Sequence, residues 1–196
     1  MSKFEDIKEN LLNSFDKLNE VLEIELRDNF SIIDHKGQSF IIVSIDYENN
    51  TFIIRQNGQN SIESNFDSTK LFNIENAKGI AFIPIDGKKG LLGFGDSYCD
   101  FIFFDDNNLC FVEFKLNAIS LAERAIRKNR KKAISQLKNT IALFDKKLSK
   151  NYEGLELEAY ACEPKIYPDD GWEDFRIAFL EEVGILLFKE NTKICK

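Results

Sequence analysis

The chain has 196 residues, 43% of them hydrophobic, and its 33 acidic against 26 basic residues give a net charge of −7. Such a length fits one domain with a substantial core, and no apolar run has the length of a membrane span. The N-terminus carries no secretory-leader pattern, and four scattered cysteines with one histidine show no zinc-ligand spacing. We therefore expect a cytoplasmic protein with reduced thiols, without a membrane segment or a zinc site.

The first segment has the period of a helix. Apolar residues recur at steps of three and four from Phe4 to Leu22, and Ser2 stands where an N-cap is needed. The acidic residues in between, Glu9 and Glu20 among them, fall mostly on a solvated face. The sequence predicts an N-terminal helix.

Strand patterns begin after residue 30. Residues 40–47 and 51–55 are rich in β-branched and aromatic side chains and flank a short polar turn, which predicts a β-hairpin. Residues 56–69 are polar and rich in Asn and Ser, which predicts a loop. The N-terminal part, about 1–70, is either an elaboration inserted on a core or a separate docking element, and its sequence leaves both open.

A further strand is predicted at residues 79–84, where Pro84 ends the strand or places it at a sheet edge. The Gly-Lys-Lys-Gly sequence of residues 87–90 predicts a turn. Neither Gly-x-x-x-x-Gly-Lys-Ser/Thr nor Gly-x-Gly-x-x-Gly occurs in this glycine-rich part. The chain therefore lacks the patterns typical of nucleoside-triphosphate and dinucleotide binding.

The most informative stretch is residues 98–115. Two aromatic-rich runs, 101–104 and 109–114, flank the polar sequence Asp-Asp-Asn-Asn, which predicts a second hairpin. A loop centred on that polar sequence pairs Phe104 with Leu109. This pairing fixes the register of the two strands.

The same register brings charged side chains together. It sets Asp100 opposite Glu113, and because strand side chains alternate between faces, Lys115 shares their face. Opposed like charges destabilise a sheet, so two carboxylates in an apolar hairpin favour a role such as holding a hard cation like Mg²⁺. The alternative is a solvent-facing side of the sheet with an incidental Glu-Lys pair. Asp96 is a second acidic candidate, ranked lower because it lies in the turn before the strand.

Residues 118–149 predict a long amphipathic helix with one apolar stripe. Arg130 falls near that stripe, so a kink or break is expected around 128–131. Residues 113–150 hold eleven basic and three acidic residues, a net charge of +8, and the rest of the chain carries −15. The basic residues on the polar side either guide a phosphate backbone or form only a solvated face. They include Arg124, Arg127, Lys128 and Lys131.

Asp100, then Glu113-Phe-Lys115 after a hairpin, then a helix carrying Gln136, resemble the PD-(D/E)XK nuclease superfamily. The resemblance covers about residues 90–160. It implies a small mixed sheet flanked by helices, as in restriction endonucleases, and phosphodiester hydrolysis that depends on Mg²⁺ or Mn²⁺. Asp100 and Glu113 would be the metal ligands and Lys115 the catalytic lysine. Gln136 would orient a lysine, a water or a phosphate, whereas without the resemblance it is only a helix-surface amide.

The resemblance also implies a partner, namely nucleic acid, with DNA preferred to RNA. The four basic residues named above would hold its backbone phosphates, with binding that weakens as salt rises. A glutamate of the first helix, Glu9 or Glu20, is left open as a further metal ligand.

The C-terminal part predicts further strands. Residues 155–162 alternate and would join the sheet, and residues 164–171 predict a loop. The apolar segment that follows is ambiguous between helix and strand. We expect strands at 175–180 and 184–188, with a turn at 181–182.

The sequence thus predicts a single domain, residues 1–196, of the α/β (α+β) class, with a mixed central sheet flanked by helices and a nuclease-like core at about 79–188. The expected function is metal-dependent hydrolysis of phosphodiester bonds in nucleic acid. The alternative is a catalytically inactive module of the same fold that binds protein or nucleic acid. Its acidic surface could dock on a basic protein partner, and a homodimer is compatible with either function.

Overall fold

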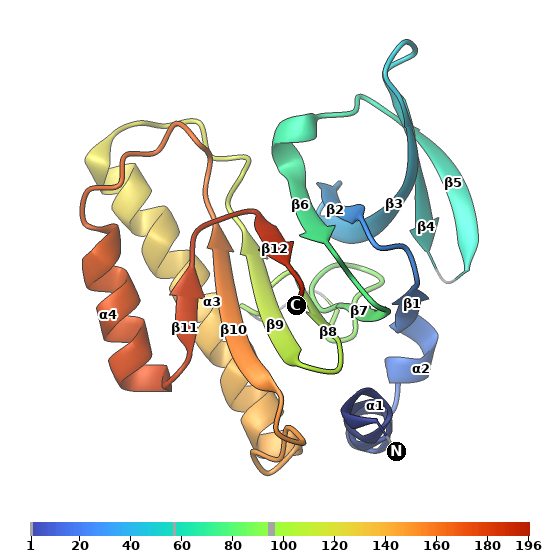
Figure 1. Cartoon of the computed structure of the whole chain (residues 1–196). Coiled ribbons are helices and arrows are strands. Elements are labelled where there is room, and N and C mark those ends of the chain that lie inside the picture. Colours follow the sequence, from blue (N-terminus) through green and yellow to red (C-terminus); the bar gives the residue numbers. More distant parts are fainter. Residues whose placement is uncertain (1, 57, 94–96) are drawn as a thin grey trace.

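The computed structural model describes residues 2–56, 58–93 and 97–196 (Figure 1). In these parts of the chain, two six-stranded mixed sheets are flanked by four α-helices, which confirms the predicted α/β (α+β) class. The expectation of one central sheet is corrected, because the strands divide between two sheets, called sheet A and sheet B below. The strand patterns indicated where strands form but contained no information on which strands pair.

Sheet A consists of β1 (Glu23–Glu25), β7 (Ile80–Pro84), β8 (Phe101–Phe104), β9 (Asn108–Phe114), β10 (Glu156–Cys162) and β11 (Leu186–Phe188), in the order β1-β7-β8-β9-β10-β11. From β1 to β9 the neighbours are antiparallel, whereas β9, β10 and β11 run parallel. The predicted hairpin register is confirmed, since Phe104 pairs with Leu109 and Phe101 with Val112.

The helices are α1 (Lys3–Ser14), α2 (Leu18–Val21), α3 (Glu123–Lys147) and α4 (Trp172–Val183). The Ser2 hydroxyl caps α1 by accepting a hydrogen bond of 3.3 Å from the Glu5 backbone N, as the sequence predicts. α3 begins later than expected and runs unbroken through 128–131. The expected break is wrong because the buried Arg130 guanidinium is paired with Glu163. No helix in the described ranges is both long and apolar enough to cross a membrane.

Residues 172–188 fold differently from their prediction. The strand expected at 175–180 and the turn expected at 181–182 both lie within α4. Trp172 and Phe179, two helical turns apart, are the buried residues of this helix. Gly184 then adopts a left-handed conformation (φ 78°) that ends α4, and β11 follows parallel to β10. A parallel neighbour needs a crossover connection, and α4 supplies it.

Sheet B consists of β2 (Phe30–His35), β3 (Gln38–Asp46), β4 (Thr51–Gln56), β5 (Gln59–Ser64), β6 (Leu71–Glu75) and β12 (Thr192–Ile194), in the order β12-β6-β2-β3-β4-β5. The predicted N-terminal hairpin is β3 and β4. The loop predicted at 56–69 is wrong, because β5 pairs with β4 along its whole length, and Ser68–Lys70 forms a 3₁₀ turn. β5 is an exposed edge strand, so its polar side chains resemble those of a loop.

Sheet A is covered on both faces. One face, with Ile102 and Phe111, packs against all four helices, and the other, with Phe101 and Val112, packs against sheet B. Strands buried on both faces have continuous apolar sequences, which explains the two aromatic-rich runs of the hairpin. A charged residue at the end of β9 is therefore surrounded by core, and that is the position of Glu113.

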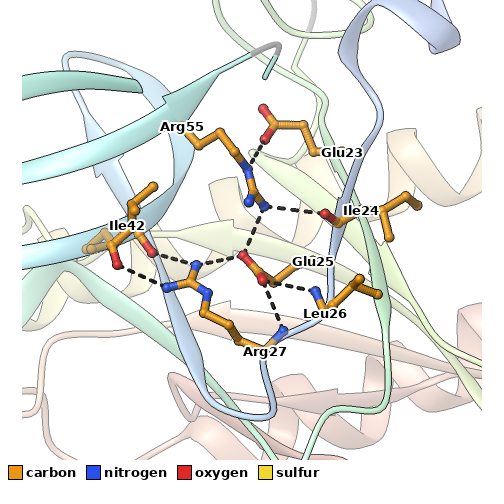
Figure 2. A network of polar contacts seen from close by, with 8 residues as sticks. Glu23, Ile24, Glu25, Leu26, Arg27, Ile42 and Arg55 are labelled. Atoms are coloured by element: carbon orange, nitrogen blue, oxygen red, sulfur yellow. Dashed lines mark hydrogen bonds and ion pairs between the residues drawn. The ribbon is translucent and has the colours of Figure 1, made fainter. Parts of the chain in front are cut away.

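A polar network joins the two sheets at the opposite side of the molecule from α4 (Figure 2). A bulge in β3 leaves the carbonyls of Ile42 and Val43 free to accept hydrogen bonds of 2.8 and 3.1 Å from the Arg27 guanidinium. Arg27 also pairs with Glu25 of β1 at 2.6 Å, and Arg55 of β4 reaches the same carboxylate at 2.9 Å. The network therefore fixes β1 of sheet A against β3 and β4 of sheet B.

Candidate functional site

The β8–β9 hairpin carries two carboxylates at its open end. The ladder ends with Phe101 paired with Val112, and the Asp100 backbone N also donates to the Val112 carbonyl at 3.0 Å, one residue out of that register. The predicted pairing of Asp100 directly opposite Glu113 is therefore not part of the ladder, although the two carboxyls lie close together. Asp100 Oδ2 in turn accepts a hydrogen bond of 2.5 Å from the Phe114 backbone N. The Asp100 carboxylate is therefore held against the end of β9.

Burial changes the protonation of both carboxyls. Glu113 is only 2% exposed, and Asp100 is half-buried. Burial raises the pKa of Asp100 to about 7, although the Phe114 N–H and the Lys115 ammonium oppose that shift. Burial also raises the pKa of Glu113 well above its usual range, and the nearby Asp100 carboxylate adds to the effect. Without a cation, the pair therefore retains a proton close to neutral pH.

Lys115 and Gln136 complete this cluster. Lys115 Nζ forms an ion pair with Glu113 Oε1 and donates to Gln136 Oε1 at 3.0 Å and to the Phe114 carbonyl at 3.2 Å. Gln136, on the buried side of α3, donates from Nε2 to the Tyr98 carbonyl at 2.8 Å, which fixes the direction of its amide. The structure thus brings together all four residues that the sequence nominated for catalysis. We call them the carboxylate–lysine cluster: Asp100, Glu113, Lys115 and Gln136.

A second contact from α3 positions the chain just before Asp100. The Thr140 hydroxyl accepts a hydrogen bond of 2.8 Å from the Cys99 backbone N and donates to the Gln136 carbonyl at 2.9 Å. Thr140 follows Gln136 by four residues, so the two lie on the same helix face. That spacing is the only sequence signal for this contact.

One oxygen of the cluster has no donor. Glu113 Oε2 is buried, and with both carboxyls ionised no described residue donates a hydrogen bond to it; the proton that the pair retains near neutral pH is the one that Glu113 can share with Asp100. A buried polar atom without a partner is unfavourable, and a hard cation is one partner that would satisfy it. Two carboxylates suit Mg²⁺ or Mn²⁺, which bind carboxylate oxygens and water. Within the described ranges no group of three or more His, Cys, Asp or Glu side chains is placed to hold a metal ion. A cation here would thus depend on water or substrate oxygens for its remaining ligands.

Two further carboxylates lie near enough to Asp100 to affect its pKa, and the sequence does not predict either of them as a site residue. Asp34 of β2 accepts a hydrogen bond of 3.0 Å from Asn117 Nδ2, and burial raises its pKa. The charges of Asp34 and Asp86 both raise the pKa of Asp100. The backbone N atoms of Ile85 and Asp86 donate to the Asp100 carbonyl at 2.9 and 3.3 Å. These contacts join segments far apart in the sequence, so no local pattern predicts them.

The basic residues nominated for nucleic-acid binding lie in the first half of α3 and are all exposed: Arg124, Arg127, Lys128 and Lys131. Gln136 lies on the opposite, buried side of the same helix. Arg127 lines a hollow between α3 and α4. In Figure 1 the start of α3 extends beyond the end of β9, the edge of the sheet where the cluster lies. The structure therefore places the basic residues on that side of the molecule but not in contact with the cluster.

The other acidic candidates are separate from the cluster. Glu9 and Glu20 are exposed, and the start of α1 lies at the turn of the hairpin, where the Phe4 backbone N donates to Asp106 Oδ1 at 3.0 Å. That turn is the end of the hairpin remote from Asp100. Asp96 lies outside the described residues.

Neither the family models, nor the curated proteins, nor the solved structures with which the chain was compared match it. The functional argument therefore depends on the geometry of the cluster.

Proposed function

We propose that the protein is a metal-dependent nuclease of the PD-(D/E)XK type, hydrolysing phosphodiester bonds in nucleic acid, in DNA rather than RNA. The observation that carries the proposal is the convergence of Asp100, Glu113, Lys115 and Gln136 in one hydrogen-bonded cluster. These residues come from two strand ends and a helix, and a chance assembly of buried charges is unfavourable.

Asp100 and Glu113 would hold the cation, because their carboxyls lie together and Glu113 Oε2 has no other partner among the described residues. When bound, Mg²⁺ or Mn²⁺ supplies a Lewis acid for a phosphate oxygen and lowers the pKa of a coordinated water. The carboxyl pair would bind it in the doubly ionised state, so it gives up its retained proton on binding. The like-charge repulsion between the two carboxylates is then removed.

Lys115 would serve the chemistry rather than the cation. Its ammonium projects from the end of β9 and is held by the Gln136 amide, which is itself fixed by the Tyr98 carbonyl. An ammonium positioned in this way can hold the attacking water and stabilise negative charge that develops on the phosphate. Gln136 acts by keeping the ammonium in place.

A specific observation favours the second candidate, a catalytically inactive module with the same fold. Lys115 is already engaged by Glu113, Gln136 and Phe114, so within the described residues the ammonium is satisfied without a substrate. A cluster whose only role is to hold β9 against α3 would have its lysine fully hydrogen-bonded in the same way. Such a module would act by binding nucleic acid or a protein.

Cleavage of supercoiled plasmid and of a single-stranded RNA, with Mg²⁺, with Mn²⁺ or with a chelator, separates the two candidates. A nuclease cleaves only with metal, and Glu113→Gln lowers the rate at least about a hundredfold, the usual effect of losing a group that acts at the transition state. Glu156→Gln, an exposed glutamate of β10, is the matched control and leaves the rate unchanged. Metal-independent cleavage, or equal rates for both variants, would show that the cluster is structural.

A further inference from the structure

Sheet B forms a cleft that the proposed chemistry does not use. It has a volume of about 520 Å³ and lies between the β2–β3 turn, the strands β4 and β5, and the loop of residues 87–90. Pockets of this size accept small ligands. The argument uses the lining residues Phe40, Ile54, Gln56, Asn60, Lys88 and Lys89.

The cleft combines an apolar wall with amide groups. Phe40 is half-buried and Ile54 is 3% exposed, and both belong to the small core of sheet B. Gln56 and Asn60, on β4 and β5, add amides that both donate and accept hydrogen bonds. A flat aromatic or apolar surface beside such amides suits a nucleobase, which has a π face and a polar edge.

Positive charge lies at one side of the cleft. Lys36 forms an ion pair with Glu63 at 2.8 Å, so its charge is largely compensated. Lys89 Nζ donates to the neutral Gln56 amide at 2.6 Å. In the part of the chain that the structure describes, neither Lys88 nor Lys89 forms an ion pair, and both are exposed. Two uncompensated ammonium groups in a protein of net charge −7 favour an anion at this position.

The lysine-bearing loop is fixed against the β2–β3 turn. Gln38, a buried amide, accepts from the Lys89 backbone N at 3.0 Å and donates to the Asp86 carbonyl at 3.1 Å. Gly87 (φ 98°) approaches so closely that a Cβ there would stand 2.4 Å from Gln38 Oε1. The same loop reaches the candidate site, because the Asp86 backbone N donates to the Asp100 carbonyl. The cleft and the carboxylate–lysine cluster therefore share one rigid loop.

We propose that this cleft binds one nucleotide, with its base against Phe40 and Ile54 and its phosphate at Lys88 and Lys89. This proposal rests on the proposed nuclease function in one respect, namely that the bound nucleotide belongs to the strand that is cleaved. The bound unit is either such a nucleotide or a free mononucleotide, since both present the same base and phosphate. Occupancy of the cleft would position a strand beside Asp100 through the shared loop.

Fluorescence anisotropy with a labelled single-stranded oligonucleotide tests the proposal, in chelator so that no metal-dependent cleavage takes place. The double variant Lys88→Glu, Lys89→Glu should bind at least about tenfold more weakly than wild type, with the salt slope of log K reduced by about 0.7, the contribution of the one single-strand phosphate held at these lysines. The matched control, Lys17→Glu with Lys78→Glu, carries the same charge change on exposed lysines outside the cleft.

Further measurements separate base from phosphate, and strand from free nucleotide. An abasic oligonucleotide of equal length should bind wild type about 5- to 100-fold more weakly, the usual contribution of one stacked base. If a mononucleotide displaces the oligonucleotide from wild type but not from the Lys88→Glu, Lys89→Glu variant, the cleft binds free nucleotides. If the mononucleotide does not displace the oligonucleotide from wild type, the cleft binds a strand. Equal binding of the cleft and control variants, or of abasic and normal strands, overturns the proposal. Because oligonucleotide binding is measured without metal, the nucleotide-binding proposal can be correct even if the cleavage test contradicts the nuclease function.

Discussion

Removing one charge from the cluster should change how the metal-free protein responds to pH. Asp100, Glu113 and Lys115 hold two carboxyls and one ammonium, so the buried cluster is neutral only while one carboxyl keeps its proton. In Glu113→Gln the Asp100 carboxylate and the ammonium balance without a proton. Lys115 also keeps its hydrogen bonds to Gln136 and to the Phe114 carbonyl.

The magnitude follows from the Asp100 pKa. Burial raises it from 3.8 to about 7, so the unfolded chain releases this proton at lower pH than the folded protein does. The Asp100 carboxyl therefore makes the stability of the wild type fall as pH rises from about 4 to about 7, and Glu113, whose pKa is raised well above its usual range, adds a further fall. Three pKa units correspond to about 4 kcal/mol, and because Asp100 keeps some exposure we expect about 2–4 kcal/mol. Glu113→Gln keeps the burial that raises the pKa of Asp100, so it should keep this fall and lose only the further destabilisation that comes from the raised pKa of Glu113 itself.

Urea denaturation in chelator, at about pH 5 and about pH 8.5, measures the effect. The two proteins should be equally stable within about 1 kcal/mol at the lower pH, and Glu113→Gln should be the more stable protein at the higher one, because it lacks the ionised Glu113 that the wild type must bury. Glu156→Gln, which removes an exposed carboxylate, should follow wild type. If Glu113→Gln is the less stable protein at the higher pH, the Glu113–Lys115 pair is a stabilising ion pair and the proposed repulsion is wrong.

Three more predictions test separate parts of the molecule. Lys115→Met should keep Mn²⁺ binding in calorimetry within a few-fold and lose plasmid cleavage by about 10²–10³; lost metal binding would mean that the lysine holds the site together. Lys128→Glu with Lys131→Glu should weaken duplex binding and lower the salt slope by about 2, and unchanged binding would leave this face of α3 merely solvated. Burial alone would raise the pKa of Glu25, but Arg27 and Arg55 lower it from 4.5 to about 2. The ionised Glu25 carboxylate should therefore stabilise the fold by about 3 kcal/mol above pH 4.5, and this stabilisation should be lost as pH falls towards 2. In urea denaturation between about pH 5 and pH 3, Glu25→Gln should be destabilised and show a smaller pH dependence, whereas equal slopes would contradict it.

The β8–β9 hairpin could be predicted because its information is local. Aromatic runs of fixed length around a polar turn define one register, and the structure has that register from the Phe104–Leu109 pair to the Phe101–Val112 pair. The contact between Lys115 and Gln136 could not be predicted from local patterns, because Gln136 lies twenty-one residues later in the chain and the contact depends on how α3 crosses β9. It was nominated through resemblance to a family pattern, and the hydrogen bond to Lys115 supports that nomination by geometry alone.

The errors have two physical sources. The sequence of β5 predicts a loop because an edge strand exposes its side chains, so its pattern carries no alternation. The sequence of α4 partly predicts a strand, because apolar residues such as Ile177 and Leu180, which remain exposed, obscure the helical period of its buried face. The pairing of strands into two sheets, and the approach of Asp34 to Asp100, depend on long-range contacts that no window of sequence contains.

Two buried glutamates in this protein are held in opposite ways, and the contrast bears on function. Glu25 lies between two guanidinium groups and two backbone N–H donors, and its pKa is held at about 2. Glu113 has one ammonium, an adjacent carboxyl and an oxygen without a donor, and its pKa is raised. Both sites were built by the same sheets, so the fold is able to satisfy a buried carboxylate fully. A site that leaves one unsatisfied, at the open end of a hairpin and beside a fixed lysine, favours a missing partner over a purely structural role.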